Sequence, residues 1–123
     1  MSLKIVVADD DLDICELLDI SFRKAGFTVR TAIDGMQAFD EIVQERPDIV
    51  VLDVVMPKIS GVDVVKMMRK DDDLREIPAI LVSARGQDLE FDFDLETDRV
   101  EFVVKPFNLQ DLVRLVNEIV SLG

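Results

Sequence analysis

The sequence predicts one α/β domain in which a parallel sheet carries helices on both of its faces. The chain has 123 residues, a common size for a domain with a single core. Short apolar runs alternate along it with segments of helical spacing. Most of these runs are continuously apolar, which indicates strands buried on both faces. A repeated order of strand, helix and strand with short loops then implies right-handed crossovers.

Five apolar runs are predicted to form the strands. They are rich in Val and Ile, whose branched side chains favour extended backbone. In chain order the predicted strands are Lys4 to Ala8, Phe27 to Thr31, Ile49 to Leu52, Ala79 to Val82 and Phe102 to Val104.

Between the first strands, apolar residues recur at the spacing of one helix face. The first helix is expected to begin after Asp11, which caps it, and to end at Gly26, whose lack of a Cβ suits a left-handed C-terminal position. The second helix is expected from Gly35 to Glu45, stopping before Pro47. The side chains predicted to face inward are Ile14, Leu17, Leu18 and Phe22 in the first helix, and Phe39, Ile42 and Val43 in the second.

Two later helices have N-terminal capping signals. Ser60 followed by Asp63 is similar to a capping box, and the third helix is expected to continue to about Lys70. The last helix has Asn108 as its expected N-cap, with Asp111 three residues later. The predicted apolar faces are Val64, Val65, Met67 and Met68 in the third helix, and Leu109, Leu112, Val113, Val116 and Val120 in the last.

The charge balance argues against nucleic acid and anionic membranes as partners. Lys and Arg number 14 against 26 Asp and Glu, which gives a net charge of -12 and repulsion from phosphate groups. No apolar run approaches the roughly 20 residues that a spanning helix needs, and the first residues do not resemble a cleaved secretion signal. We therefore expect a cytoplasmic protein with no direct nucleic-acid or membrane binding.

The lack of His and the scarcity of Cys exclude several kinds of chemistry. Without His there can be no Ser-His-Asp triad, no His-ligated zinc or haem, and no imidazole acid–base catalyst. Cys15 is the only cysteine, so an internal disulfide and a Cys-x-x-Cys site are excluded. We expect Cys15 to be a structural thiol. Any chemistry must use carboxylates, hydroxyls and lysine.

Polar residues stand where the predicted strands end. Because the carboxyl ends of parallel strands meet at one edge, where ligands bind, we expect these side chains to converge. Carboxylates packed together repel one another unless a cation neutralises them, and a few oxygen ligands with retained water suit Mg²⁺ better than Ca²⁺. The residues that follow the strands are Asp9, Asp10 and Asp11, then Asp53, Ser83 and Lys105.

This set of residues predicts a phosphoryl-transfer site. Mg²⁺ would bridge Asp53 to an incoming phosphoryl group, Lys105 would pair with the phosphate charge, and Ser83 would donate a hydrogen bond. The nucleophile would be a carboxylate and the product an aspartyl phosphate. A loop cap would explain Asp53 alone, but four polar strand ends together favour a site.

On these residues the whole chain, residues 1–123, resembles a receiver domain of the two-component response-regulator family, of the CheY-like type. The motifs are individually weak but highly specific in this order and spacing. They are V-V-A-D-D-D at 6–11, V-L-D-V-V-M-P at 51–57, Gly61, L-V-S-A-R at 81–85 and V-V-K-P-F at 103–107. The resemblance implies a flavodoxin-like strand order of 2-1-3-4-5.

The resemblance also implies a role for each residue of the site. Asp53 would be the phosphoacceptor, and Ser83 and Lys105 would hold the phosphoryl oxygens. The Mg²⁺ ligands that it implies are Asp10 and Asp53 directly, Asp9 mainly through bound water, and the backbone carbonyl of Val55.

Signalling by such a domain is a population shift between two surfaces. Phe102 stands at the place of the family's aromatic switch residue, which turns inward when Ser83 moves toward the phosphoryl group. An ordinary core aromatic is the equal alternative. The Lys105–Pro106 peptide is expected to be cis, as in the family, or else a trans peptide leading into the last helix.

The partners expected from the resemblance are proteins. Because the chain has no His, the phosphohistidine must belong to another molecule, either a sensor histidine kinase or a His-containing phosphotransfer protein. A downstream effector or an output domain would receive the signal, and the phosphorylated form could also pair with itself as a homodimer.

The segment from Asp88 to Glu96 departs from the family pattern. It reads D-L-E-F-D-F-D-L-E, a polar–apolar alternation with the period of a strand, where the family has its fourth helix. We expect a short, poorly ordered or shifted helix, with an irregular or extended segment as the alternative. Asp98 and Arg99 replace the small residues that often precede the last strand. The side chains expected to form an association surface are Leu89, Phe91, Phe93 and Leu95.

Two other functions have weaker support. A receiver-shaped interaction module that no longer switches would fit the unusual segment at 88–99. A phosphatase with an aspartate nucleophile would share the strand-end Asp and Mg²⁺, but the D-x-D-x-T signature and the room for a cap domain are missing. We therefore expect no turnover enzyme, only transfer to Asp53 and later hydrolysis of its phosphate.

Overall fold

Strands and helices alternate from Lys4 to Ser83, as the sequence predicts. The computed structural model describes residues 2–84 and 99–122. The predicted fourth helix and the expected association surface of 88–96 lie outside these residues. The elements described are, in order, β1 (Lys4–Ala8), α1 (Leu12–Lys24), β2 (Thr28–Ala32), α2 (Gly35–Glu45), β3 (Ile49–Asp53), α3 (Gly61–Arg69), β4 (Ala79–Ser83), β5 (Val100–Val104) and α5 (Leu109–Leu122).

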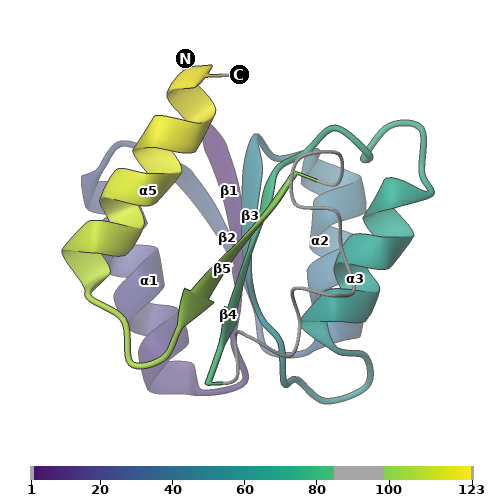
Figure 1. Ribbon diagram of the computed structural model, residues 1–123, viewed down its shortest axis with the longest axis horizontal. Coiled ribbons are helices and arrows are strands. Elements are labelled where there is room, and N and C mark those ends of the chain that lie inside the picture. Colours follow the sequence, from purple (N-terminus) through teal and green to yellow (C-terminus); the bar gives the residue numbers. More distant parts are fainter. Residues whose placement is uncertain (1, 85–98, 123) are drawn as a thin grey trace.

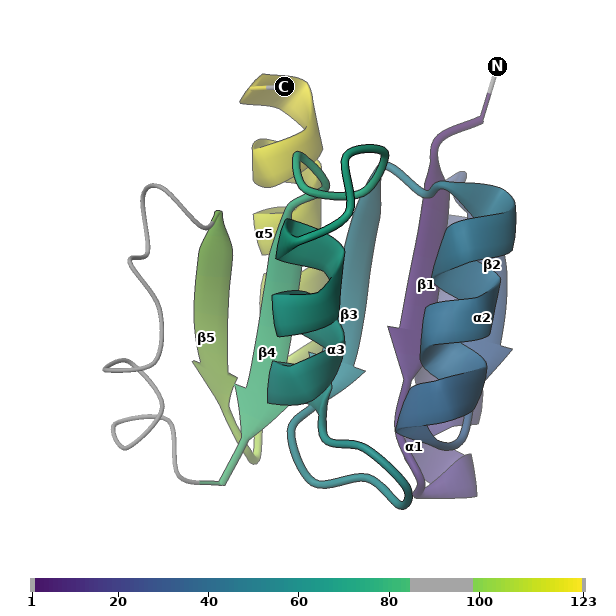
Figure 2. The same cartoon turned by 90° about the vertical axis from the view of Figure 1, so that its right-hand side faces the viewer.

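The five strands described form one parallel sheet with the order β2-β1-β3-β4-β5. Helices α1 and α5 cover one face of the sheet, and α2 and α3 cover the other (Figure 1). The predicted fold class and the flavodoxin-like strand order are thereby confirmed. All five strands run in the same direction, so their carboxyl ends share one edge, at the bottom of Figure 2. We call it the carboxyl edge.

The sheet is buried between two apolar layers. Successive residues of a strand point to opposite faces, so β1 and β3 contribute to both layers, which explains their continuously apolar sequences. The layer under α2 and α3 includes Val6, Ala8, Val50, Leu52, Ile42 and Met68, and the layer under α1 and α5 includes Ile5, Val7, Val51, Phe22, Leu112 and Val116.

The edge strands are less buried than predicted. Every residue of β3 and β4 is buried, whereas β2 buries only Val29 and Ala32, and β5 buries only Val100. An edge strand has a neighbour on one side only, which leaves more of it in contact with solvent. The bounds also differ slightly, since β2 begins at Thr28 rather than one residue earlier, and β5 begins two residues before Phe102.

The predicted N-caps are confirmed. The Asp11 carboxylate accepts hydrogen bonds from the backbone N–H groups of Asp13 and Ile14 at 3.0 and 3.3 Å. The side chains of Ser60 and Asn108 accept equivalent bonds at the starts of α3 and α5. Across the described ranges, no helix combines the length and the apolar character needed to cross a bilayer.

Helix α1 is terminated by a Schellman motif in which Gly26 takes the left-handed position, as the sequence suggests. Gly26 has a φ of +99°, and its N–H donates to the carbonyl of Arg23 at 3.0 Å. The N–H of Phe27 donates to the carbonyl of Phe22, also at 3.0 Å. The rings of these two Phe residues then pack edge to face with centroids 5.6 Å apart. A residue with a Cβ would be strained at this φ.

Three residues predicted to face the core lie on the surface instead. Leu17 is 55% exposed, Val43 is 47% exposed and Met67 is 37% exposed. A helix that lies on a sheet buries one stripe of its surface, so the flanks of a broad apolar face remain in solvent. The buried stripe is formed by their neighbours Leu18, Ile42 and Met68.

Cys15 is buried where α1 meets the sheet. Its thiol donates a weak hydrogen bond to the carbonyl oxygen of Ala32, with the two atoms 3.8 Å apart. Burial raises the pKa of the Cys15 thiol, and the charge of Asp9 raises it further. A buried, protonated thiol is a poor nucleophile, which supports the structural role predicted for it.

Candidate functional site

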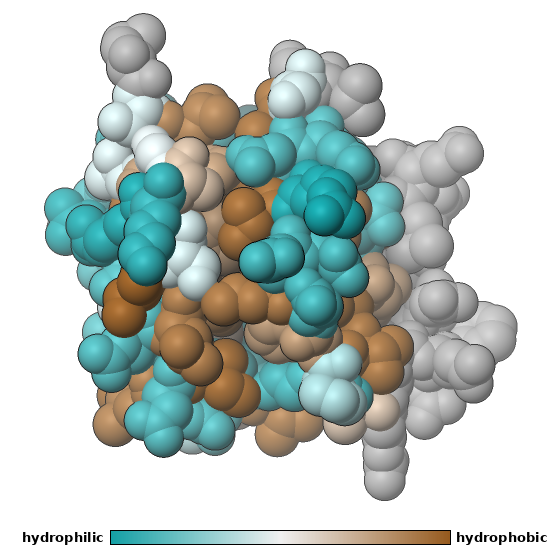
Figure 3. All heavy atoms as spheres, turned by 90° about the vertical axis from the view of Figure 1, so that its left-hand side faces the viewer, coloured by the Kyte–Doolittle hydropathy of each residue, from teal (hydrophilic) through white to brown (hydrophobic). Residues whose placement is uncertain are grey.

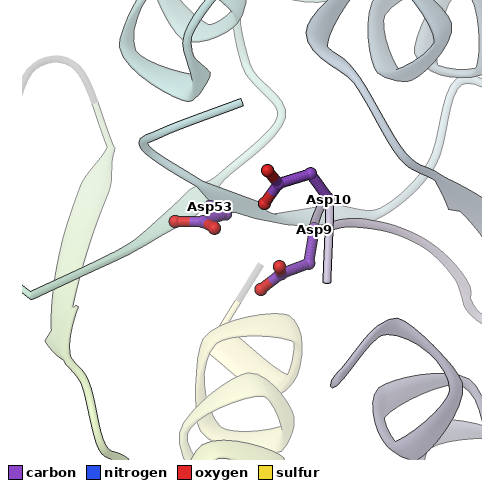
Figure 4. Close-up of side chains that lie close together, drawn as sticks. All are labelled: Asp9, Asp10 and Asp53. Atoms are coloured by element: carbon purple, nitrogen blue, oxygen red, sulfur yellow. The ribbon is translucent and has the colours of Figure 1, made fainter. Parts of the chain in front are cut away.

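Three carboxylates meet at the carboxyl edge. Asp9 and Asp10 directly follow β1, and Asp53 is the last residue of the adjacent strand β3. Each offers an oxygen atom, and these oxygens all lie within 4.8 Å of one another. Figure 4 shows the three side chains converging on one small space. The convergence predicted from the strand ends is confirmed for these residues.

Backbone groups help to fix two of the three carboxylates. Asp9 and Asp53 are 3% and 7% exposed, whereas Asp10 is exposed. Asp9 Oδ1 accepts a hydrogen bond from the N–H of Asp11 at 2.9 Å, and Asp53 Oδ1 accepts a longer one from the N–H of Val55 at 3.4 Å. Two carboxylates are thus held inside the fold while the third faces solvent.

Lys105 directly follows the edge strand β5 and reaches these carboxylates. Its Nζ lies 3.1 Å from Asp53 Oδ2 and 3.2 Å from Asp9 Oδ2. Its backbone N–H donates to the carbonyl of Ser83 at 2.9 Å, which continues the ladder between β4 and β5. The Lys105–Pro106 peptide is cis, as the family resemblance implies. The ammonium reaches past the end of β4 to both buried carboxylates.

The buried groups of the site shift one another's ionisation. Burial raises the pKa of the Asp53 carboxyl; the hydrogen bond from Lys105 offsets part of that shift, and the charge of Asp9 adds to it. Burial alone would lower the pKa of Lys105, but the hydrogen bonds and charges of Asp53 and Asp9 raise it overall. The lysine is therefore a cation at neutral pH. One ammonium faces three carboxylates, which leaves an excess of negative charge.

Ser83 and Phe102 lie on the two strands beyond Asp53. Ser83 is the last residue of β4 and is buried, one strand away from the phosphoacceptor candidate. Phe102 pairs with Leu81 in the register of β4 and β5, and its partly buried ring packs against the layer under α2 and α3. Such packing suits both a switch residue and a core aromatic, so the switch role of Phe102 stays a prediction.

The loop from β3 to α3 carries the predicted backbone ligand of the metal. Val55 is 74% exposed, and its backbone N–H donates to Asp53 Oδ1. The N-terminus of α2, at Asp34 and Gly35, contacts this loop farther along. From the sequence, Gly35 marked only the start of a helix. The one signal for a further role was the low helix propensity of glycine at that position.

The donor set suits a hard divalent cation. Asp9, Asp10 and Asp53 offer carboxylate oxygens, which are the ligands that Mg²⁺ prefers. Mg²⁺ usually keeps several waters, so a few protein ligands leave room for water or for a phosphate oxygen. Its two positive charges would also balance the excess negative charge of the site. The residues present therefore fit the ion that the sequence predicts.

Comparison with known families gives a match over most of the chain. The model of the response regulator receiver domain matches residues 5–117. This stretch contains the three carboxylates as well as Ser83 and Lys105.

Solved structures with similar folds include several response regulators. The chemotaxis response regulator CheY4 of Vibrio cholerae is 24% identical with a TM-score of 0.86, and the alignment covers 97% of this chain and 99% of that chain. The receiver domain of Francisella response regulator 1452 is 28% identical with a TM-score of 0.86, covering 98% of each chain. The signal receiver domain of a signal transduction histidine kinase from Syntrophus aciditrophicus is 25% identical with a TM-score of 0.85, covering 98% of this chain and 91% of that chain.

Proposed function

We infer the function from one established premise: the chain belongs to the response regulator receiver domain family. We propose that residues 1–123 act as one cytoplasmic phosphoacceptor domain. In a Mg²⁺-dependent reaction, its Asp53 accepts a phosphoryl group from a phosphohistidine of another molecule. The observation that carries this proposal is the placement of Asp53. Its buried carboxylate lies against two other carboxylates and 3.1 Å from a lysine ammonium.

The proposed transfer is a simple displacement at phosphorus. A carboxylate oxygen of Asp53 forms the new P–O bond while the P–N bond to the donor imidazole breaks, and the imidazole nitrogen takes up a proton. The product is an acyl phosphate, which water later hydrolyses to restore the carboxylate. Bound Mg²⁺ would neutralise charge on the phosphoryl oxygens and orient them for in-line attack.

The side chains around Asp53 have complementary roles in this proposal. Lys105 pairs with a phosphoryl oxygen through an ammonium already held beside Asp53, and Ser83 donates a hydrogen bond to another. The residues proposed to hold Mg²⁺ are Asp10 and Asp53 directly, Asp9 mainly through water, and Val55 through its carbonyl. We propose no turnover enzyme, because the acceptor is part of the chain itself.

Phosphorylation would change the contacts of Lys105 first. In the structure its ammonium bonds to Asp53 Oδ2 and Asp9 Oδ2. Phosphorylation of Asp53 replaces one carboxylate charge by about -1.5 to -2 on the phosphoryl group, so Lys105 and Ser83 are drawn toward the new oxygens. We propose that Phe102 repacks with Ser83, and that the shifted population is recognised by an effector, an output domain or a second copy of the chain.

An apolar groove beside the site supports a protein as the phosphodonor. The groove has a volume of about 410 Å³ and lies between α1 and the segment that joins β5 to α5. Figure 3 shows apolar side chains in the lower half of this face, nearest the carboxyl edge. Because Lys105 is a lining residue and its Nζ lies 3.1 Å from Asp53 Oδ2, a donor seated there would approach Asp53. The lining residues are Ile14, Leu17, Leu18, Lys105, Pro106, Phe107 and Leu109.

The proposed acceptor can be identified by chemical trapping. The protein is incubated with Mg²⁺ and phosphoramidate, whose P–N bond imitates phosphohistidine, and is then treated with borohydride, which reduces an acyl phosphate to the alcohol. Peptide mass spectrometry is expected to find homoserine in place of Asp53, and only in samples with Mg²⁺. Reduction at Asp9 or Asp10 with Asp53 intact would refute the assignment of the acceptor.

A further inference from the structure

The loop from β3 to α3, residues 54–60, is fastened to the N-terminus of α2. The backbone N–H of Gly35 donates to the carbonyl of Pro57 at 3.2 Å. The ammonium of Lys58 lies 3.7 Å from Asp34 Oδ2. Through its other oxygen, Asp34 also caps α2 by accepting from the N–H of Gln37 at 2.8 Å. One helix end therefore holds the loop by a backbone bond and an ion pair together.

The contact at Gly35 leaves no room for a side chain. A Cβ at this position would overlap the backbone carbonyl of Ile59 and would lie 2.5 Å from the Cγ1 atom of the same residue. Gly35 is buried and does not have a left-handed φ. Glycine is therefore needed here for the close approach of two backbones and not for an unusual conformation. Any larger residue must displace residues 57–59 from α2.

A displacement at Ile59 would be carried along the loop toward Asp53. The N–H of Ile59 donates to the carbonyl of Pro57 at 3.0 Å, and the N–H of Gly61 donates to the carbonyl of Val54 at 2.9 Å. These bonds close the loop on itself, and Lys58 between them has a left-handed φ of 73°. A loop braced in this way moves as a unit, so its far end at Val54 and Val55 moves as well.

We propose that Gly35 is a positioning residue for the metal site, which sets the affinity for Mg²⁺ by fixing the loop that carries the Val55 carbonyl. This inference rests on the proposed function, in which that carbonyl is a ligand. Gly35 itself is not one of the proposed Mg²⁺ ligands. Residues that orient the metal ligands without contacting the metal typically change the metal affinity by about 10- to 100-fold when they are mutated.

The test compares two glycine substitutions. Gly35→Ala inserts a methyl group between α2 and the loop, whereas Gly26→Ala strains the end of α1 at φ +99° with no atom nearby for the new methyl group to meet. Calorimetric titration with Mg²⁺ is expected to show about tenfold weaker binding for Gly35→Ala and unchanged binding for Gly26→Ala. The rate of phosphorylation by acetyl phosphate is expected to recover in Gly35→Ala when Mg²⁺ is raised to saturation. Thermal melting of both variants reports the loss of stability separately.

The outcomes separate this inference from the function on which it rests. Wild-type protein that neither binds Mg²⁺ nor accepts a phosphoryl group would refute the proposed function. If the wild type does both, equal Mg²⁺ affinity in wild type and Gly35→Ala, or equal weakening in both glycine variants, would overturn the role of Gly35. Should Gly35→Ala not fold, Lys58→Met removes only the ion pair of the exposed Lys58 ammonium to Asp34, and about twofold weaker Mg²⁺ binding is expected. Unchanged affinity in that variant would also overturn the proposal.

Discussion

Replacing Lys105 with Met is expected to slow the phosphorylation of Asp53 by about 100-fold, the usual effect of removing one preorganised donor from a transfer site. The Lys105 ammonium lies 3.1 Å from Asp53 Oδ2 and 3.2 Å from Asp9 Oδ2, beside the space where the phosphoryl oxygens would arrive. Methionine has a similar length but no charge. The rate is measured by intact-protein mass spectrometry at saturating Mg²⁺ with acetyl phosphate as donor.

Two further variants make this prediction specific. Lys24→Met is the matched control, because Lys24 is an exposed residue at the end of α1 opposite the carboxyl edge. Lys105→Arg retains the positive charge on a larger planar group and is expected to recover only part of the rate. A rate in Lys105→Met equal to that in Lys24→Met would show that the ammonium has no part in the transfer.

Mg²⁺ is expected to raise the melting temperature of the wild-type protein by about 10 °C when its concentration is 100 times the dissociation constant. Binding at that concentration contributes about 2.7 kcal/mol, and each kcal/mol shifts the melting temperature of a domain of this size by about 4 °C. The physical source is relief of repulsion among three carboxylates whose oxygens lie within 4.8 Å. Differential scanning calorimetry measures the shift.

The controls for this shift must separate binding from screening. Any salt screens a net charge of -12, so ionic strength is held constant with NaCl. Asp10→Asn removes an exposed carboxylate ligand of the proposed metal site without disturbing Lys105. This variant is expected to lose most of the Mg²⁺-induced shift in melting temperature. Asp72→Asn is the matched control, because its side chain is 93% exposed and lies outside the carboxylate cluster. A full shift in Asp10→Asn would place the ion elsewhere.

Local sequence signals were sufficient for most of the fold. Continuous apolar runs located β3 and β4, because strands buried on both faces tolerate few polar residues. Short-range hydrogen bonds decide helix caps, so Asp11 and Ser60 could be assigned from a few neighbouring residues. The edge strands were harder to delimit, because half-exposed positions admit polar residues and weaken the pattern.

The carboxylate cluster was also accessible from the sequence. In a parallel sheet the position after a strand fixes the edge at which a side chain lies, so Asp9, Asp53 and Lys105 could be expected to meet. Which oxygens face one another depends on loop conformation, and the two ion pairs of Lys105 become visible only in the structure.

Features that depend on contacts between distant elements could not be predicted. The approach of Gly35 to Ile59 joins the N-terminus of α2 to a loop far along the sequence, and nothing local requires it. The exposure of Leu17 and Val43 could not be predicted for a similar reason. The spacing of apolar residues predicts which face of a helix is apolar. The width of the stripe that the sheet buries depends on how the helix lies on the sheet.

The most direct measurement is the intact mass of wild-type protein and Asp53→Asn after incubation with acetyl phosphate, each with Mg²⁺ or with EDTA. We expect a single phosphoryl adduct on the wild-type protein in Mg²⁺ and no adduct in the other three samples. A receiver domain known to accept this donor, treated in parallel, verifies the conditions. An equal adduct on Asp53→Asn, or no adduct on the wild type while the parallel domain is phosphorylated, would contradict the assignment of Asp53 as a Mg²⁺-dependent phosphoacceptor.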